Sequence, residues 1–230
     1  MNNKLVVTKH NHLIEASYKL TLEEQRLILA CIAKIDSREN GNIPSSITIT
    51  AKEYGELFGI QLKHAYQQLR EATDNLYERD IKIRDAKTRK RRRWVQAADY
   101  NDSQGSVSLS FSDYVKPYIG QLNGLFKSYQ LQNVCSLKSI YSIRLYELLN
   151  QWRETGNRYV RLDDFKNMLQ ISDKYERYAD LRKCVIEPAI KELNQKTDFC
   201  VSFKPEKQGK KIVRLTFNFS TTDLTENRVK

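Results

Sequence analysis

The most regular hydrophobic pattern in the chain lies in residues 175–219. Within residues 175–197, apolar positions recur three and four residues apart, which predicts a helix with one apolar stripe. The stripe consists of Ile186, Ala189, Ile190 and Leu193. Residues 199–204 and 212–219 are predicted strands, joined by a basic loop at 205–211. A long helix followed by a hairpin with a basic tip is the second half of a winged helix, which sets a helix in a DNA groove.

The first half of the chain has a similar order of patterns. Thr21 and Glu24 have the spacing of a capping box, which predicts a helix from there to about residue 35. Further helices are predicted at 51–58 and 62–79, and strands at 47–50, 81–84, 94–100 and 107–111, with residues 87–93 as a basic turn. The pattern then restarts with a helix at 136–152, a strand at 159–161 and a helix at 162–169.

Two segments share one arrangement, ITITAKEYGELFGI at residues 47–60 and RYVRLDDFKNMLQI at residues 158–171. Each has a strand, a polar start, an aromatic residue (Tyr54 or Phe165) and a closing isoleucine. Each is followed by a long helix, a strand, a basic turn and a strand. Repetition of one supersecondary unit predicts tandem domains. The predicted fold is therefore α+β, with two tandem winged-helix domains at residues 1–130 and 131–220 and a flexible tail at 221–230.

The charge of the chain narrows the choice of partner. The formal net charge is +11, and residues 126–230 alone hold 20 Lys and Arg against 13 Asp and Glu. A basic surface favours a polyanion, with nucleic acid ahead of an anionic membrane. No apolar run reaches the roughly 20 residues of a membrane span, and the start of the chain lacks an export signal. The four cysteines are scattered, so neither a disulfide nor a metal or other cofactor is expected.

The winged-helix prediction assigns candidate DNA contacts to helix starts and to wings. In the second copy the helix start holds Lys174, Tyr175, Arg177, Tyr178, Arg182 and Lys183. In the first copy it holds Lys63, Gln67 and Arg70, a less charged set that suits backbone or protein contacts equally. The basic wing residues are Arg89, Lys90, Arg91, Arg92 and Arg93 in the first copy, and Lys207, Lys210 and Lys211 in the second. Arginine at a helix start suits guanine edges, while basic wing tips suit phosphates.

Catalysis has little support in the sequence. His10 and His12, together with the 13 tyrosines, superficially resemble the metal-binding pair and nucleophile of a rolling-circle nicking initiator. That chemistry calls for an apolar residue between the histidines, whereas Asn11 is polar. No glycine-rich phosphate loop is present in the sequence. The prediction is a non-enzymatic DNA-binding protein, with a nicking initiator and a plain winged-helix transcriptional regulator as the alternatives.

Three motifs resemble those of the iteron-binding plasmid replication initiators. They are residues 6–14 with 18–21 and 24–27, the IRLYELL helix at 143–149, and residues 181–183 with 187–194, 197–198 and 207–211. One departure is Lys210, where the family commonly has arginine. Lysine keeps the positive charge but not a bidentate contact.

The resemblance implies a bacterial cytoplasmic protein that binds directly repeated origin sequences (iterons) in duplex DNA as a monomer, through both domains. It also implies help in opening AT-rich DNA and in recruiting the host initiator and replicative helicase proteins. A homodimer in equilibrium with the monomer, formed through the first domain, would repress the protein's own gene.

Overall fold

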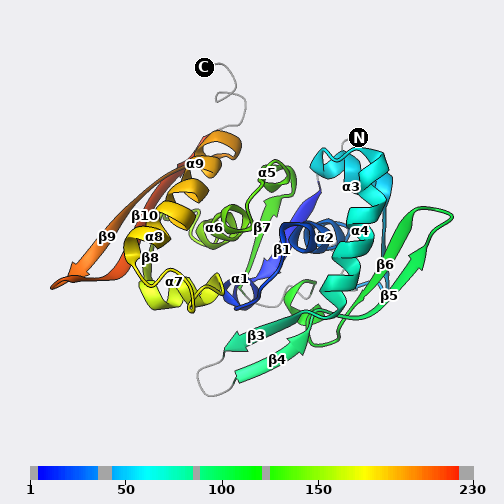
Figure 1. Ribbon diagram of the computed structural model, residues 1–230, viewed down its shortest axis with the longest axis horizontal. Coiled ribbons are helices and arrows are strands. Elements are labelled where there is room, and N and C mark those ends of the chain that lie inside the picture. Colours follow the sequence, from blue (N-terminus) through cyan, green and yellow to red (C-terminus); the bar gives the residue numbers. More distant parts are fainter. Residues whose placement is uncertain (1–4, 36–42, 85–88, 121–124, 223–230) are drawn as a thin grey trace. The chain divides into compact units, whose positions relative to one another are not determined.

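The computed structural model describes residues 5–35, 43–84, 89–120 and 125–222 (Figure 1). The chain divides into two compact units, unit 1 at residues 1–136 and unit 2 at residues 137–230. Each unit contains a three-stranded antiparallel sheet covered by helices. The boundary expected between residues 130 and 131 stays a prediction. So do the roles expected for the two domains, dimerisation and DNA backbone contact for the first and the main reading of iterons for the second.

Unit 1 is organised around the sheet β2-β6-β5, formed by β2 (Ile47–Thr50), β6 (Ser106–Phe111) and β5 (Val95–Asn101). Its principal helices are α2 (Leu22–Ala33), α3 (Ala51–Phe58) and α4 (Leu62–Tyr77). The capping box predicted at the start of α2 is confirmed, because Thr21 Oγ1 accepts from the Glu24 amide at 3.2 Å and Glu24 accepts from the Thr21 amide at 2.9 Å.

Unit 2 repeats the same topology with the sheet β8-β10-β9, formed by β8 (Asn157–Arg161), β10 (Lys211–Thr221) and β9 (Phe199–Gln208). It is covered by α6 (Ile140–Asn150), α7 (Leu162–Met168), α8 (Tyr178–Leu181) and α9 (Glu187–Lys196). Between α8 and α9 lies a π-helical turn, η2 (Arg182–Ile186). The predicted stripe is confirmed, because all four of its residues are buried.

The internal repeat has the same backbone geometry in both units. The helices α3 and α7 are each followed within two residues by a left-handed backbone position, Gly59 with φ 67° and Gln170 with φ 56°. The closing isoleucine then donates its amide five residues back, Ile60 to Gly55 at 2.9 Å and Ile171 to Lys166 at 2.9 Å. This is the helix-ending arrangement in which free carbonyls are satisfied by the chain that follows. The two tandem winged helices predicted from the repeat are therefore confirmed.

Unit 1 holds several elements beyond the winged helix. The strands β1 (Val6–His10) and β7 (Phe126–Gln130) pair antiparallel, although more than a hundred residues separate them in sequence. Three short helices accompany them, α1 (Asn11–Glu15), α5 (Gln132–Cys135) and the 3₁₀ helix η1 (Lys116–Tyr118). The helix expected over 136–152 is restricted to α6, since Ser139 caps its start by accepting from the Tyr141 amide at 3.2 Å.

The wing predicted in the first copy is wrong in its topology. The strands β3 (Asp80–Arg84) and β4 (Arg89–Arg93) form a separate two-stranded ribbon, hereafter the basic ribbon. Residues 89–93 are thus a strand and not a turn, and residues 87–88 lie outside the described part. β5 pairs with β6 instead of returning along β3, so the wing of unit 1 is the β5–β6 hairpin with its turn after Asn101. A run of basic residues can form a strand instead of a loop when an acidic residue on the partner strand compensates the positive charge.

Two boundaries in the second copy also differ from the prediction. The helix begins at Tyr178 and not at residue 175, because Tyr175 has φ 53° and Arg177 is the extended residue before the first turn. The predicted loop at 205–211 is mostly strand, since Pro205 pairs with Leu215 and the turn lies between Gln208 and Lys211. β9 is an edge strand, so the amide that Pro205 lacks leaves no gap in the sheet.

Candidate nucleic-acid interface

The start of the second helix in unit 2 presents exposed basic residues. Lys174, Arg177 and Lys183 are exposed, and the side chain of Arg177 is 81% accessible, with Asp180 at 4.0 Å. Lys174, Tyr175 and Arg177 precede the helix instead of lying on it. Lys166 Nζ donates to the Tyr175 carbonyl at 3.4 Å, which fixes this entry segment. A helix start bordered by cations suits the polyanionic wall of a DNA groove.

Arg182 is the candidate base-reading residue whose position is best defined. Its Nε lies 2.6 Å from Glu187 Oε1, and its guanidinium carbon lies 6.0 Å from the centre of the Phe203 ring on β9. Tyr178, one helical turn earlier, has a buried hydroxyl without a hydrogen-bond partner in the described residues. Burial raises the pKa of Tyr178, with Arg182 opposing the rise. The tyrosine therefore stays neutral beside the arginine.

The wing of unit 2 carries its cations at the tip. Gly209 has φ 61°, which the tight turn requires and which glycine adopts without strain. Lys207, Lys210 and Lys211 are all exposed around this turn. In the stem, Glu206 accepts from Arg214 at 3.3 Å and also binds Thr216. The acidic residue is therefore engaged within the hairpin, and the tip lysines suit phosphate contacts.

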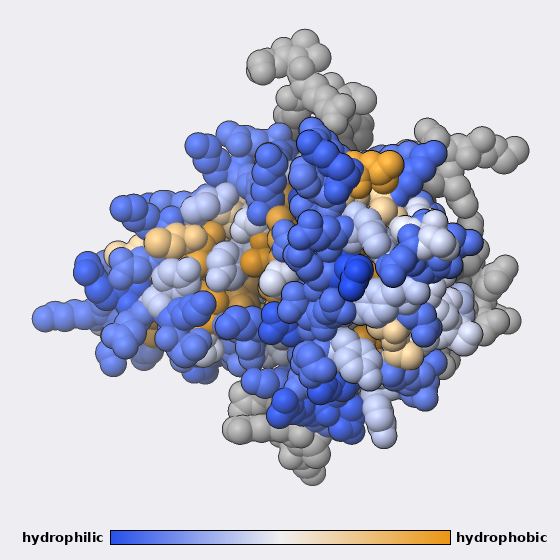
Figure 2. All heavy atoms as spheres, turned by 45° about the vertical axis from the view of Figure 1, so that its right-hand side comes forward, coloured by the Kyte–Doolittle hydropathy of each residue, from blue (hydrophilic) through white to orange (hydrophobic). Residues whose placement is uncertain are grey.

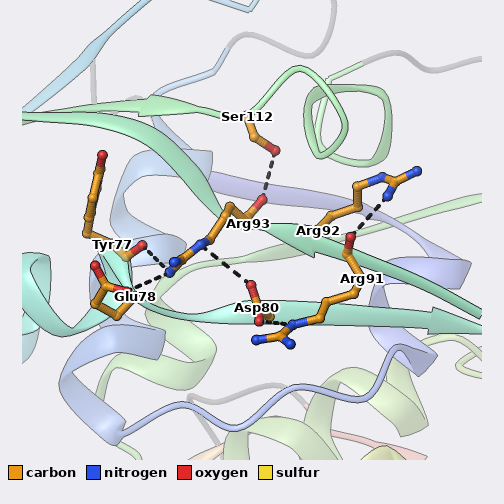
Figure 3. A network of polar contacts seen from close by, with 7 residues as sticks. All are labelled: Tyr77, Glu78, Asp80, Arg91, Arg92, Arg93 and Ser112. Atoms are coloured by element: carbon orange, nitrogen blue, oxygen red, sulfur yellow. Dashed lines mark hydrogen bonds and ion pairs between the residues drawn. The ribbon is translucent and has the colours of Figure 1, made fainter.

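The basic ribbon of unit 1 is held by carboxylates at its base (Figure 3). Asp80 binds Arg91 and lies 3.7 Å from Arg93, and Glu78 lies 3.0 Å from Arg93. Arg93 also donates to the Tyr77 carbonyl at 2.9 Å, and Ser112 donates to the Arg93 carbonyl at 2.8 Å. Arg91 and Arg93 therefore stabilise the ribbon as well as giving it positive charge.

The two remaining described cations of β4 are placed differently. Arg92 lies with its guanidinium 4.3 Å from the centre of the Tyr114 ring, and Lys90 is exposed. Arg92 borders an open pocket of about 450 Å³ together with Tyr77, Val95, Gln96 and Ser112. The side chain of Arg89 lies outside the described part, although its backbone pairs with Arg84. Lys90 and Arg92 both carry positive charge, which suits phosphate contacts.

The helix and wing of unit 1 are tied to each other by acidic residues. Tyr66 on α4 donates to Asp102 in the wing turn, and Tyr100 on β5 donates to Asp74 on α4. The bond to Asp102 raises the pKa of Tyr66, and burial followed by the bond to Asp74 raises that of Tyr100. Sequence reasoning missed both carboxylates, and the only signal was the acidic residue Asp102 in the turn.

The three candidate contacts on α4 lie close to this tied face. Gln67 donates to Glu71 at 2.9 Å, and Arg70 lies 6.0 Å from the centre of the Tyr100 ring. Lys63 is exposed near the helix start. These two cations and one glutamine make a weaker anion site than the corresponding part of unit 2.

His10 and His12 take part in local hydrogen bonding and ring packing. His10 Nδ1 accepts from the His12 amide at 3.0 Å, and its ring packs edge-on against Tyr118 and Phe126. Burial, then the neighbouring His12, lowers the pKa of His10. Within the described ranges, no group of three His, Cys, Asp or Glu side chains could hold a metal ion.

The length and hydropathy of the helices bear on a membrane span in the part of the chain that is described. None of the helices there is both long enough and apolar enough to cross a bilayer. On the face shown in Figure 2, hydrophilic side chains cover most of the surface and apolar ones form small, separate patches.

Comparison with known proteins decides the family. The model of the initiator replication protein WH1 domain matches residues 6–150, and that of the initiator Rep protein WH2 domain matches residues 161–219. The chain belongs to the initiator replication protein family. The family resemblance inferred from the motifs is thereby confirmed.

Individual relatives of this initiator agree with the family match. A replication initiation protein of Escherichia coli is 30% identical over 99% of this chain and 76% of its own length. The PI protein of Escherichia coli is 26% identical over 95% of this chain and 84% of its own length. A crystal structure of the Pi initiator protein in complex with iteron DNA matches with a TM-score of 0.80 and 26% identity, over 97% of this chain and all of that chain.

Proposed function

We propose that this initiator acts on a plasmid origin, where it binds directly repeated sequences (iterons) in duplex DNA. The observation that carries the proposal is the match over 97% of the chain to an initiator in complex with iteron DNA. The basic helix start and wing of unit 2 support it, because they are the two elements by which a winged helix contacts DNA.

The two units have different tasks in this proposal. Unit 2 reads bases through Arg182, with Arg177 and Lys183 beside it, and grips phosphates with Lys207, Lys210 and Lys211. Unit 1 adds phosphate contacts through Lys90 and Arg92 of the basic ribbon, and Lys63, Gln67 and Arg70 contribute less. Two linked DNA-binding modules gain affinity because the second binding event is intramolecular.

Further steps follow from the same proposal. Binding to an array of repeats promotes opening of adjacent AT-rich DNA and recruits the host initiator and the replicative helicase. A dimer formed through unit 1 represses the protein's own gene, and dissociation to monomers releases the form that binds iterons. The protein works in the bacterial cytoplasm, without a cofactor and without catalysis of its own.

Footprinting of the purified protein on the DNA that adjoins its gene tests the central step. We expect protected blocks that recur about every two helical turns, since one turn of DNA spans about 10.5 base pairs. A uniform footprint that ignores sequence would contradict the proposal.

A second experiment separates initiation from the alternatives. The gene and its adjacent repeats are placed on a DNA circle that lacks any other origin. Maintenance of that circle supports an initiator, whereas repression of a promoter without maintenance indicates a transcriptional regulator. Metal-dependent cleavage of single-stranded origin DNA with a covalent tyrosine adduct would indicate a nicking enzyme.

A further inference from the structure

The helix that carries Arg182 is interrupted by a π-helical turn. In η2 the Glu187 amide donates to the Arg182 carbonyl, five residues back instead of four. The residue that follows is Pro188, which has no amide hydrogen. In an uninterrupted α-helix the proline ring would clash with the carbonyl of Cys184. The wider π turn accommodates the proline, and such single turns often occur at functional sites.

The π turn changes which residue lies next to Arg182. On an α-helix, residues three and four apart are neighbours, and residues five apart are not. The five-residue hydrogen bond of η2 brings Glu187 beside Arg182, where Nε and Oε1 are 2.6 Å apart. The two side chains remain half exposed, at 53% and 47%. The ion pair is thus a consequence of the local helix geometry.

The environment of Arg182 fixes the direction of its guanidinium. Glu187 contacts Nε, so this pair does not use the two terminal Nη groups. The ring of Phe203 on β9 lies 6.0 Å from the guanidinium carbon, on the strand that leads to the wing. Two Nη groups presented together are the part of arginine that binds guanine O6 and N7 bidentately.

From these contacts we infer that Glu187 is a positioning residue for base recognition, which orients Arg182 through the π turn that Pro188 imposes. The inference rests on the proposed function, in which Arg182 reads bases. Glu187 makes no favourable contact with DNA itself, because a carboxylate near phosphates is repelled. Its contribution is to specificity, since a side chain held in place loses less conformational entropy on binding.

The test compares affinities for a duplex with the repeats adjoining the gene and for a random duplex of equal length, at one salt concentration. Glu187→Gln preserves shape and removes the charge. We expect it to lower the affinity for the repeats about 3- to 10-fold. That factor corresponds to the entropy cost of ordering one long side chain on binding. Its affinity for random DNA should rise slightly, because a negative charge is lost.

A matched control comes from the same segment. Asp180→Asn removes one negative charge beside Arg177, whose contact is long at 4.0 Å. We expect this variant to raise the affinity for both duplexes alike. If Glu187→Gln behaves in the same way, Glu187 acts only as a charge and the inference is overturned. Thermal melting of each variant shows whether the fold is retained.

A double-mutant cycle shows whether Glu187 acts through Arg182. In an Arg182→Ala background we expect Glu187→Gln to leave the ratio of the two affinities unchanged, because the side chain to be oriented is gone. An equal loss of the ratio in both backgrounds would contradict the inference. Pro188→Ala, which permits an α-helical turn, should lower the ratio as Glu187→Gln does, and an unchanged ratio would exclude the π turn as the cause.

The outcome also separates this inference from the proposed function. If the wild-type protein does not distinguish the repeats from random DNA, both the function and the positioning role are wrong. If the wild-type protein distinguishes them but the cycle is additive, the proposed function stands and only the role of Glu187 is refuted.

Discussion

The two units have the same topology, but they differ in the charge of the second helix and of the wing. In unit 2 the wing tip is a lysine turn, and the helix start is bordered by Lys174, Arg177 and Lys183. In unit 1 the wing turn holds Asp102, which binds Tyr66, and α4 binds the wing strand through Asp74 and Tyr100. A winged helix is therefore not in itself a base-reading surface, because side chains decide what the helix and wing can contact.

The basic charge of unit 1 has a different location. It lies on an additional ribbon whose arginines are anchored by Asp80 and Glu78. The backbone of β3 is joined to Ser17 by two hydrogen bonds, Ser17 to Lys82 at 3.1 Å and Lys82 to Ser17 at 3.0 Å. Directly after β4, Trp94 is fully buried against Tyr18, with ring centres 5.0 Å apart. The ribbon is thus firmly attached to the rest of unit 1.

The largest effect is expected from the core of unit 2. Glu147 is fully buried and binds Arg144 at 3.2 Å. Glu147→Ala removes the carboxylate that pairs with the buried Arg144 guanidinium, which costs about 3–5 kcal/mol of unfolding free energy. We expect discrimination between repeats and random DNA to disappear on unfolding of unit 2, while weak salt-dependent binding through unit 1 persists. Thermal denaturation followed by binding assays checks this, and retained discrimination after loss of unit 2 would contradict the assignment of base reading.

Arg182→Ala gives the next largest effect. Loss of a bidentate base contact weakens binding to the repeats about 10- to 100-fold, while binding to random DNA changes much less. The corresponding change in unit 1, Arg70→Ala, should weaken both only slightly. Equal losses from the two substitutions in an equilibrium binding assay would remove the proposed distinction between the units.

The basic ribbon should affect all DNA equally. Replacing Lys90 and Arg92 together by Gln lowers the affinity for repeats and random DNA by one common factor. The same change reduces the salt slope by about 2, because each phosphate that a cation neutralises adds about 0.9 to that slope. Lys52→Gln on the exposed side of α3 serves as a control for charge alone. A larger loss of affinity for the repeats than for random DNA would mean that the ribbon reads sequence.

The smallest effect tests the wing of unit 1. Lysines introduced by Ser103→Lys and Gln104→Lys should leave the salt slope unchanged, because this turn is not expected to approach DNA. Lys210→Gln with Lys211→Gln in unit 2 should instead lower the slope by about 2. A steeper slope in the first variant, measured by salt titration, would place the wing of unit 1 at the DNA.

Local patterns predicted much of this fold. The capping box at Thr21, the stripe around Ile190 and the repeated helix ending at Ile60 and Ile171 each depend on residues close in sequence. Those features could be predicted because propensity and spacing act locally. The repeat also indicated two domains, since each copy holds the same order of elements.

Features that depend on distant partners could not be predicted. The pairing of β1 with β7 joins the two ends of unit 1, and nothing in either strand specifies the other. The basic ribbon depends on Asp80 across from Arg93, which converts an apparent turn into a strand. In unit 2, Pro188 gives a π turn and Pro205 stays within a strand, because one has a helix that can widen and the other lies at a sheet edge.

The most direct test of the different roles of the units is a base-substitution profile across one repeat. Binding of wild type, Arg182→Ala and the Lys90/Arg92→Gln variant is measured against every single base-pair change. We predict that Arg182→Ala loses discrimination at one guanine position, and that the ribbon variant keeps the full wild-type profile at uniformly lower affinity. A profile flattened by the ribbon variant and unchanged by Arg182→Ala would contradict the account.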